Sequence, residues 1–138
     1  MKKLNNKKIK DLIISYKDTP KIDSSDSVYN SILQMNKTGI GIVCIINKKR
    51  KLKGIITDGD LRRFIISMNK PLAAFLSENV EKYMNKKPFT VNENYTLSKI
   101  VKTMEKKKIW DLPVIDINLN LVGLCHLHKI LKKLIKND

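Results

Sequence analysis

Hydrophobic residues along this chain follow two patterns, one typical of amphipathic helices and one typical of buried strands. Val28, Ile32 and Met35 recur at three- and four-residue steps, which predicts a helix with one apolar face. Two short apolar runs rich in β-branched residues follow, at 40–46 and 52–56, and predict a hairpin of buried strands. A second helical stripe comes next, at Leu61, Phe64, Ile65 and Met68.

The same succession of elements returns 69 residues later without a gap. It gives a helix from Leu97 to Met104, strands at 112–115 and 121–125, and a final helix from Leu127 to Ile135. Polar residues precede the first helix of each copy as candidate N-caps, at Ser27 and Thr96. The aligned positions are apolar residues and one glycine, which indicates two copies of one unit with a shared core. The clearest pairs are Ile22 with Val91, Met35 with Met104, Leu52 with Leu121, Gly54 with Gly123 and Leu61 with Ile130.

These patterns predict an α/β (α+β) fold built from two repeats. Each repeat runs helix, strand, strand, helix, with a short entry strand at Ile22 or Val91, and the two pack about a pseudo-two-fold because neither can bury its sheet alone. Each copy also has a similar lead-in, at 9–13 and at 80–84. The expected boundaries are a basic tail at 1–8, repeat 1 at 9–68, a connector at 69–79 and repeat 2 at 80–138.

The net charge of +15 changes this picture little. It arises from 28 Lys and Arg against 13 Asp and Glu, and arginine occurs only at positions 50, 62 and 63. Because base readout and bidentate phosphate contacts favour arginine, we interpret the lysines as a solvated surface and expect no nucleic-acid binding. The crowded tip Lys48–Lys49–Arg50–Lys51 is interpreted in the same way.

The apolar runs and the two cysteines bear on where in the cell the protein is expected to be. No apolar run approaches the roughly 20 residues of a membrane span, and we expect no membrane association or signal peptide. Cys44 and Cys125 stand far apart in apolar runs, which is typical of buried free thiols in a reducing cytoplasm.

The run Thr57–Asp58–Gly59–Asp60 has two compatible interpretations. Thr57 and Asp60 have the spacing of a capping box, in which each side chain satisfies a backbone N–H at a helix start. The same corner offers a hydroxyl, a flexible glycine and exposed N–H groups to a phosphate, while a carboxylate one turn on suits the two hydroxyls of a ribose. Arg62 and Arg63 follow on the helix, either as solvated residues or as partners for a ligand's phosphate or carboxylate.

The two copies together resemble the tandem cystathionine-β-synthase-type (CBS) domain pair over about residues 9–135. The resemblance is carried by Gly54–Ile55–Ile56–Thr57–Asp58–Gly59–Asp60–Leu61–Arg62–Arg63 in the first copy and by Leu112–Pro113–Val114–Ile115–Asp116 with the run 121–128 in the second. It implies that Thr57 contacts phosphate and Asp60 contacts ribose. It also implies that two such modules pair as a homodimer.

The first of these runs, with His126-x-His128, further resembles the regulatory part of arabinose-5-phosphate isomerases of the KpsF, KdsD and GutQ type. In that family a separate sugar-isomerase (SIS) domain performs the reaction, and the resemblance covers only the non-catalytic part. We therefore expect no catalytic residues, no activity of this chain alone and no required cofactor. The implied ligand is a small anion such as AMP, ADP, ATP or a CMP-Kdo-like nucleotide-sugar. Two alternatives stay open: the regulatory pair of a sugar nucleotidyltransferase, and, from another class, a basic nucleic-acid-binding protein.

The second copy departs from the motif at three positions. His126 stands opposite Thr57, His128 opposite Gly59, and Lys129 opposite Asp60, so the ribose-binding carboxylate is missing there. Lys129 is a candidate partner for an anion. The two histidines have no third ligand or carboxylate nearby in the sequence, which argues against a metal site and favours a strand-end pair. Trp110 and Asp111 are interpreted as packing and turn residues. The candidate ligand-binding residues are therefore Thr57, Asp58, Gly59, Asp60, Arg62, Arg63, His126, His128 and Lys129.

Overall fold

The computed structural model describes residues 9–136, and these form two compact units. Residues 20–88 form one, here called the first-repeat unit. Residues 9–19 and 89–136 form the other, here called the second-repeat unit. The basic tail expected at 1–8 lies outside the described residues.

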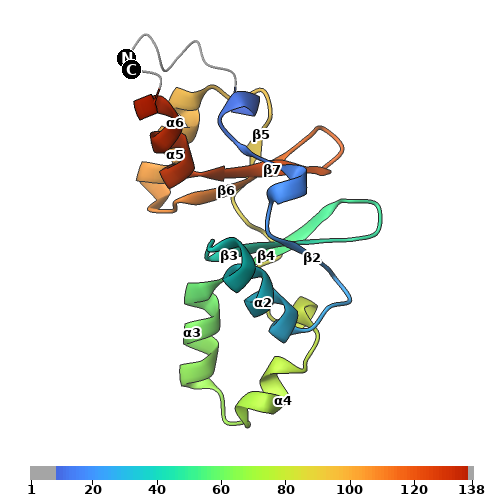
Figure 1. The fold of residues 1–138 in the computed structure, drawn as a ribbon. Helices are drawn as coiled ribbons and strands as arrows, with labels where there is room; N and C mark the ends of the chain where they lie inside the picture. The colour runs from blue at the N-terminus through green and yellow to red at the C-terminus, as the bar shows by residue number, and fades with distance from the viewer. Residues whose placement is uncertain (1–8, 137–138) are drawn as a thin grey trace. The chain divides into compact units, whose positions relative to one another are not determined.

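The first-repeat unit contains a three-stranded sheet in the order β2-β3-β4, with α2 and α3 on one of its faces (Figure 1). Strand β2 is parallel to β3, and β3 is antiparallel to β4. The elements are β2 (Lys21–Asp23), α2 (Val28–Thr38), β3 (Ile42–Ile46), β4 (Leu52–Thr57), α3 (Asp58–Ser67), α4 (Leu72–Leu76) and the 3-10 helix η3 (Val80–Lys82).

The second-repeat unit contains a four-stranded sheet in the order β1-β7-β6-β5. Strand β5 is parallel to β6, whereas β6 with β7 and β7 with β1 are antiparallel. Its elements are the 3-10 helices η1 (Ile9–Asp11) and η2 (Tyr16–Asp18), strands β1 (Ile14–Ser15), β5 (Val91–Asn92), β6 (Asp111–Ile115) and β7 (Leu121–His126), and helices α5 (Leu97–Lys107) and α6 (Leu127–Lys136).

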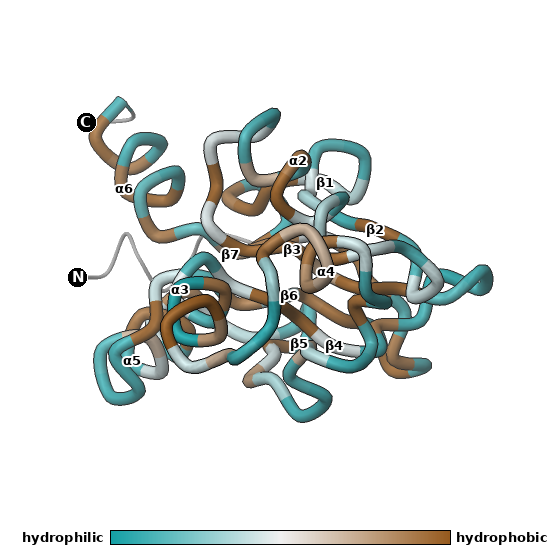
Figure 2. Tube along the Cα trace, turned by 90° about the horizontal axis from the view of Figure 1, so that it is seen from below, coloured by the Kyte–Doolittle hydropathy of each residue, from teal (hydrophilic) through white to brown (hydrophobic). Residues whose placement is uncertain are grey.

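These elements confirm the predicted repeat, and their helix starts confirm the predicted caps. The Ser27 hydroxyl accepts a hydrogen bond from the Asn30 amide at 3.3 Å, and the Thr96 hydroxyl accepts one from Lys99 at 3.2 Å. Strand β3 carries continuous hydrophobic colour in Figure 2, and the three central residues of both β3 and β6 are buried. This is the pattern of strands buried on both faces, as the apolar runs predict.

Each of the two lead-in segments, 9–13 and 80–84, packs into the unit formed by the other repeat. Ile9 and Leu12 are buried in the core of the second-repeat unit, and β1 pairs with β7 there. Val80 and Met84 are buried in the core of the first-repeat unit, where Asn85 exchanges two backbone hydrogen bonds with Ile55 at 2.8 and 3.0 Å. Each lead-in therefore completes the core of the other repeat.

The segment 69–79, expected to be a connector, contains helix α4 and a buried aromatic residue. Phe75 is fully buried, and its ring lies 4.8 Å from that of Tyr83 and 6.3 Å from that of Phe64. Tyr83 and Phe64 themselves meet edge to face at 5.1 Å. The segment is thus part of the core, because Phe75 fills the space between α3 and η3.

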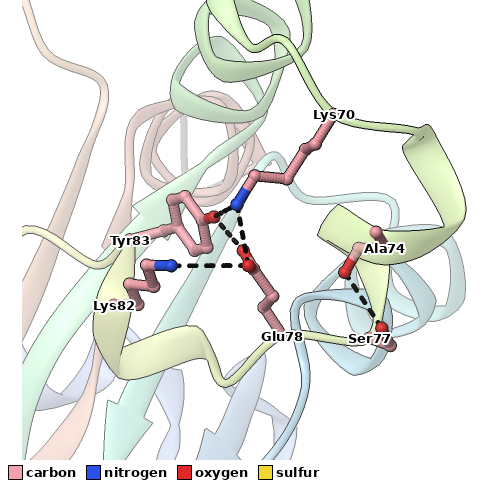
Figure 3. A network of polar contacts seen from close by, with 6 residues as sticks. All are labelled: Lys70, Ala74, Ser77, Glu78, Lys82 and Tyr83. Atoms are coloured by element: carbon pink, nitrogen blue, oxygen red, sulfur yellow. Dashed lines mark hydrogen bonds and ion pairs between the residues drawn. The ribbon is translucent and has the colours of Figure 1, made fainter.

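A polar network around Glu78 connects Lys70, before α4, with Lys82 and Tyr83 at η3 (Figure 3). The Lys70 ammonium lies 2.8 Å from Glu78 Oε1, the Lys82 ammonium lies 3.4 Å from it, and the Tyr83 hydroxyl donates to Glu78 Oε2. The Lys70 and Tyr83 hydrogen bonds lower the pKa of Glu78 from 4.5 to about 2. The same contacts raise the pKa of Lys70, with the bond to Glu78 as the main cause.

This network predicts an acid-sensitive contribution to stability. Because the folded-state pKa of Glu78 lies below its ordinary value of 4.5, the contribution is fully present above pH 4.5 and is lost as the pH falls toward about 2. In Glu78→Gln, we expect thermal stability to be lower than in the parent at pH 7 and the difference to shrink between pH 4.5 and 2. Glu81→Gln, at an exposed site on η3, is the matched control and should follow the parent profile. Parallel profiles for parent and Glu78→Gln would contradict the prediction.

Candidate functional site

The first candidate corner lies where β4 passes into α3, and its residues form the predicted capping box. The Thr57 hydroxyl accepts a hydrogen bond from the Asp60 amide at 3.1 Å, and Asp60 Oδ2 accepts one from the Thr57 amide at 3.0 Å. Asp58 Oδ1 accepts from the Gly59 amide at 2.8 Å. The capping interpretation is therefore confirmed, and it holds the hydroxyl and the carboxylate at a helix start.

Arg63 extends this corner with a positive charge. Its Nη2 lies 2.7 Å from Asp60 Oδ1, and the two residues of this ion pair are about one helical turn apart on α3. The guanidinium is mostly exposed, while the carboxylate is three-quarters covered. Arg62, also exposed, is the other candidate cation on α3. The corner thus offers a carboxylate oxygen and a guanidinium to a ligand that combines hydroxyl groups with an anionic group.

A glycine that sequence reasoning did not select helps to shape the corner. The Asp58 amide donates to the Gly41 carbonyl at 2.9 Å, which ties the start of α3 to the segment just before β3. A Cβ atom at position 41 would lie 2.7 Å from Asp58 Oδ2, so the missing side chain leaves room for that carboxylate. The only signal in the sequence is a glycine near the start of the apolar run 40–46.

The corresponding corner of the second repeat has different chemistry. His126 Nδ1 lies 2.5 Å from Asp111 Oδ1, and because an ionised carboxylate only accepts, the ring N–H donates. The two side chains are directly opposite in the β6–β7 register, where the first repeat has Ile42 opposite Thr57. The His126 and His128 rings lie 6.3 Å apart and nearly edge to face. His128 and Lys129 are exposed, and the first turn of α6 has no acidic residue.

Two sequence-based interpretations of this corner are corrected by the structure. Trp110 is 54% exposed and is not a packing residue, although its carbonyl accepts from the Leu127 amide at 2.9 Å. Asp111 supplies the carboxylate near His126 that the sequence seemed to lack. The 15-residue separation hid this contact, because only the hairpin register brings the two residues opposite each other.

The candidate residues thus divide between the two units. Thr57, Asp58, Gly59, Asp60, Arg62 and Arg63 come from the β4–α3 junction of the first-repeat unit. His126, His128 and Lys129 come from the β7–α6 junction of the second-repeat unit, with Asp111 as an addition.

Residues 9–136 contain no group of three or more His, Cys, Asp or Glu residues placed to hold a metal ion. Cys44 and Cys125 are buried and form no disulfide with each other, as predicted. Burial raises the pKa of the Cys125 thiol to about 12. A thiol with so high a pKa is not a nucleophile at neutral pH. Within the described part of the chain, no helix is both long and apolar enough to cross a membrane.

With this geometry established, comparison with known proteins identifies the class. The CBS domain matches residues 9–67 and again residues 80–136, and the chain therefore belongs to the CBS domain family as a tandem pair.

Curated relatives extend well beyond this chain. An uncharacterized protein of Chlamydia pneumoniae is 33% identical over 130 residues, which are 92% of this chain and 39% of that protein. The arabinose 5-phosphate isomerase GutQ of Escherichia coli is 30% identical over 108 residues, which are 78% of this chain and 32% of the enzyme. The chain spans about two fifths or less of the length of the relatives it matches.

Solved structures share the fold at low sequence identity. A CBS domain-containing protein from Bacillus anthracis superposes with a TM-score of 0.83 at 17% identity, covering 99% of both chains. CBSX2 in complex with AMP gives 0.81 at 18% identity, covering 94% of this chain and 97% of that one. CbpB in complex with c-di-AMP gives 0.79 at 19% identity, covering 98% and 89%. The predicted α/β fold of two CBS-type repeats is therefore confirmed.

Proposed function

We propose that this tandem CBS pair is a regulatory module that binds a nucleotide or nucleotide-sugar at the Thr57–Asp60 corner. The observation that supports this most is the carboxylate–guanidinium pair of Asp60 and Arg63 beside a capped helix start. A ribose diol would bind to Asp60, and a phosphate would be bound by Thr57, the Gly59 backbone and an arginine. The nucleotides bound by the structural relatives CBSX2 and CbpB belong to the same chemical class.

The second corner would bind a different group. His126, His128 and Lys129 place three basic side chains where the first repeat has a hydroxyl, a glycine and a carboxylate. Without a counterpart of Asp60, this corner has no acceptor pair for a ribose on the helix. It is suited to an anionic group without a ribose, and we expect the nucleoside part of a ligand to bind only at the first corner.

Regulation would follow from the difference in affinity between two states of the module, because a ligand shifts an equilibrium only by that difference. The output would be received by a catalytic domain outside this chain. The similarity to GutQ supports a sugar-isomerase domain, with arabinose 5-phosphate as its substrate. The runner-up is a sugar nucleotidyltransferase partner. The chain alone would show no turnover of arabinose 5-phosphate.

We further propose a cytoplasmic homodimer. Helix α3 exposes Ile65 and Ile66, and α6 exposes Leu131 and Ile135. Exposed apolar side chains on a helix favour association with another copy, since burial of that area is stabilising. The two buried thiols form no disulfide with each other, which fits a reducing compartment.

Calorimetric titration of the full chain with AMP, ADP, ATP and a CMP-sugar tests the ligand class. We expect saturable binding of at least one of them that changes little between low and physiological salt. Duplex DNA, titrated in parallel, represents the nucleic-acid alternative, whose affinity would fall steeply with salt. Salt-sensitive DNA binding without nucleotide binding would overturn the proposal.

A further inference from the structure

The β3–β4 and β6–β7 hairpins have the same turn geometry but differ in charge. In the first, Asn47 Oδ1 accepts from the Lys49 and Lys51 amides at 2.9 and 3.0 Å. In the second, Asp116 Oδ1 accepts from the Asn118 and Asn120 amides at 2.8 and 3.0 Å. The fourth residue of each turn is left-handed, with φ of 67° at Arg50 and 68° at Leu119.

Only the first hairpin is basic. Its tip carries Lys48, Lys49, Arg50 and Lys51, whereas the matching positions of the second hairpin are Ile117, Asn118, Leu119 and Asn120. Because the uncharged tip forms the same turn, the fold does not need the four cations. Crowding like charges also opposes folding slightly, so their presence points to a role outside the fold.

The lysines line one wall of a groove in the first-repeat unit. The groove has a volume of about 600 Å³, with residues 23–25 on one wall and Asn47, Lys48, Lys49 and Lys51 on the other. Its lining residues between 47 and 51 belong to the β3–β4 turn, which lies at the opposite end of β4 from the β4–α3 junction that holds the candidate ligand corner (Figure 1). It is therefore separate from that corner.

The wall formed by residues 23–25 is held in place by hydrogen bonds. The Ser24 amide donates to the Ile46 carbonyl at 2.8 Å, which anchors this loop to the end of β3. Asp23 Oδ2 accepts from the Ser25 amide at 2.9 Å and from the Ser25 hydroxyl at 2.5 Å. These two bonds, with a smaller effect of Lys48, lower the pKa of Asp23, so its carboxylate stays ionised at neutral pH.

We propose that this groove is a docking site for an acidic polypeptide segment. The lysine wall would bind its carboxylates, and the Asp23 carboxylate on the other wall would accept from a backbone N–H group of the segment. A nucleic-acid strand fits less well, because no aromatic residue lines the groove to stack on a base. Lysines also lack the planar fork with which arginine binds phosphate in two places.

Fluorescence anisotropy with a labelled ten-residue glutamate peptide tests this site in the full chain. We expect the triple variant Lys48→Gln/Lys49→Gln/Lys51→Gln to bind the peptide about tenfold more weakly, from three exposed ion pairs of modest strength each. The matched control removes three lysines from the face of α5, in Lys99→Gln/Lys102→Gln/Lys106→Gln, and should bind within about twofold of the parent. Both variants lose the same net charge.

Equal losses in the two triple variants would show that only net charge matters and would overturn the site. Tighter binding of a twenty-nucleotide oligothymidylate than of the peptide would overturn the choice of an acidic polypeptide. Amide chemical shifts give a second readout on the parent, because peptide addition should perturb residues 23–25 and 47–51. Calorimetry should show unchanged nucleotide binding in the hairpin variant, so that this proposal and the nucleotide proposal fail separately.

Discussion

Replacing Phe75 by alanine is expected to lower the free energy of unfolding by about 3–5 kcal/mol. Phe75 is fully buried in a core that also contains Val80, Met84 and residues of the first-repeat sheet. Truncation would leave a cavity and remove the ring contacts to Tyr83 and Phe64. The cost follows from the lost burial and from the cavity, because a packed core relaxes only in part.

Urea unfolding followed by circular dichroism measures this loss. The control is Leu72→Ala in the same helix, where the side chain is 52% exposed and the expected change is about 0.5 kcal/mol or less. If the two variants unfold at the same urea concentration, 69–79 is a connector without a role in the core.

The second large effect is expected at Gly54, the glycine that the repeat shares with Gly123. A Cβ atom at position 54 would lie 2.6 Å from the Asn85 carbonyl oxygen and 2.9 Å from Met84 Sδ. The backbone oxygen cannot move without breaking the hydrogen bonds between Asn85 and Ile55. Gly54→Ala should therefore cost about 1–3 kcal/mol, the range for overpacking.

Gly59→Ala is the matched control for this substitution. At position 59 the nearest atom to a Cβ would be Arg63 Nη1 at 3.3 Å, the far end of a flexible side chain. Alanine also has the higher helix propensity by about 1 kcal/mol, so this variant should be as stable as the parent or more stable. A Gly54→Ala protein with the parent's thermal midpoint would show that Met84 and Asn85 do not lie against β4.

Local features of this fold were predictable from the sequence because they depend on neighbours along the chain. The caps at Ser27, Thr96 and Thr57 follow from residue type and spacing within one helical turn. The repeat followed from apolar residues at a constant shift. Both the caps and the repeat can be recognised without knowledge of the tertiary structure.

Features set by long-range pairing were not predictable in the same way. The hydrophobic pattern does not predict that each lead-in segment packs into the other repeat's unit, because Ile9 and Val80 would be buried in either unit. Helix α4 is short, and Pro71 before it is also typical of a connector. The Asp111–His126 pair needed the register of a hairpin with a bulge, which apolar alternation does not define.

Gly54 and Gly123 combine a signal in the sequence with a cause that only the tertiary structure supplies. The sequence identified them as a repeated glycine, and the structure supplies the cause, because in each repeat the backbone of a lead-in lies against the strand at that point. A glycine in a strand is otherwise costly, and close approach of another backbone explains its presence.

Calorimetric titration of Asp60→Ala beside Lys129→Ala, with whichever nucleotide the parent binds, measures directly whether that nucleotide binds at the first corner. We expect affinity to fall by about tenfold or more in Asp60→Ala, since hydrogen bonds to a charged group contribute about 1.5–3 kcal/mol, and to change much less in Lys129→Ala. Thermal unfolding of Asp60→Ala controls for the fold, because the Asp60 carboxylate also forms half of the capping box at this helix start. Parent-like affinity in folded Asp60→Ala, or a larger loss in Lys129→Ala, would contradict a nucleotide site at the first corner.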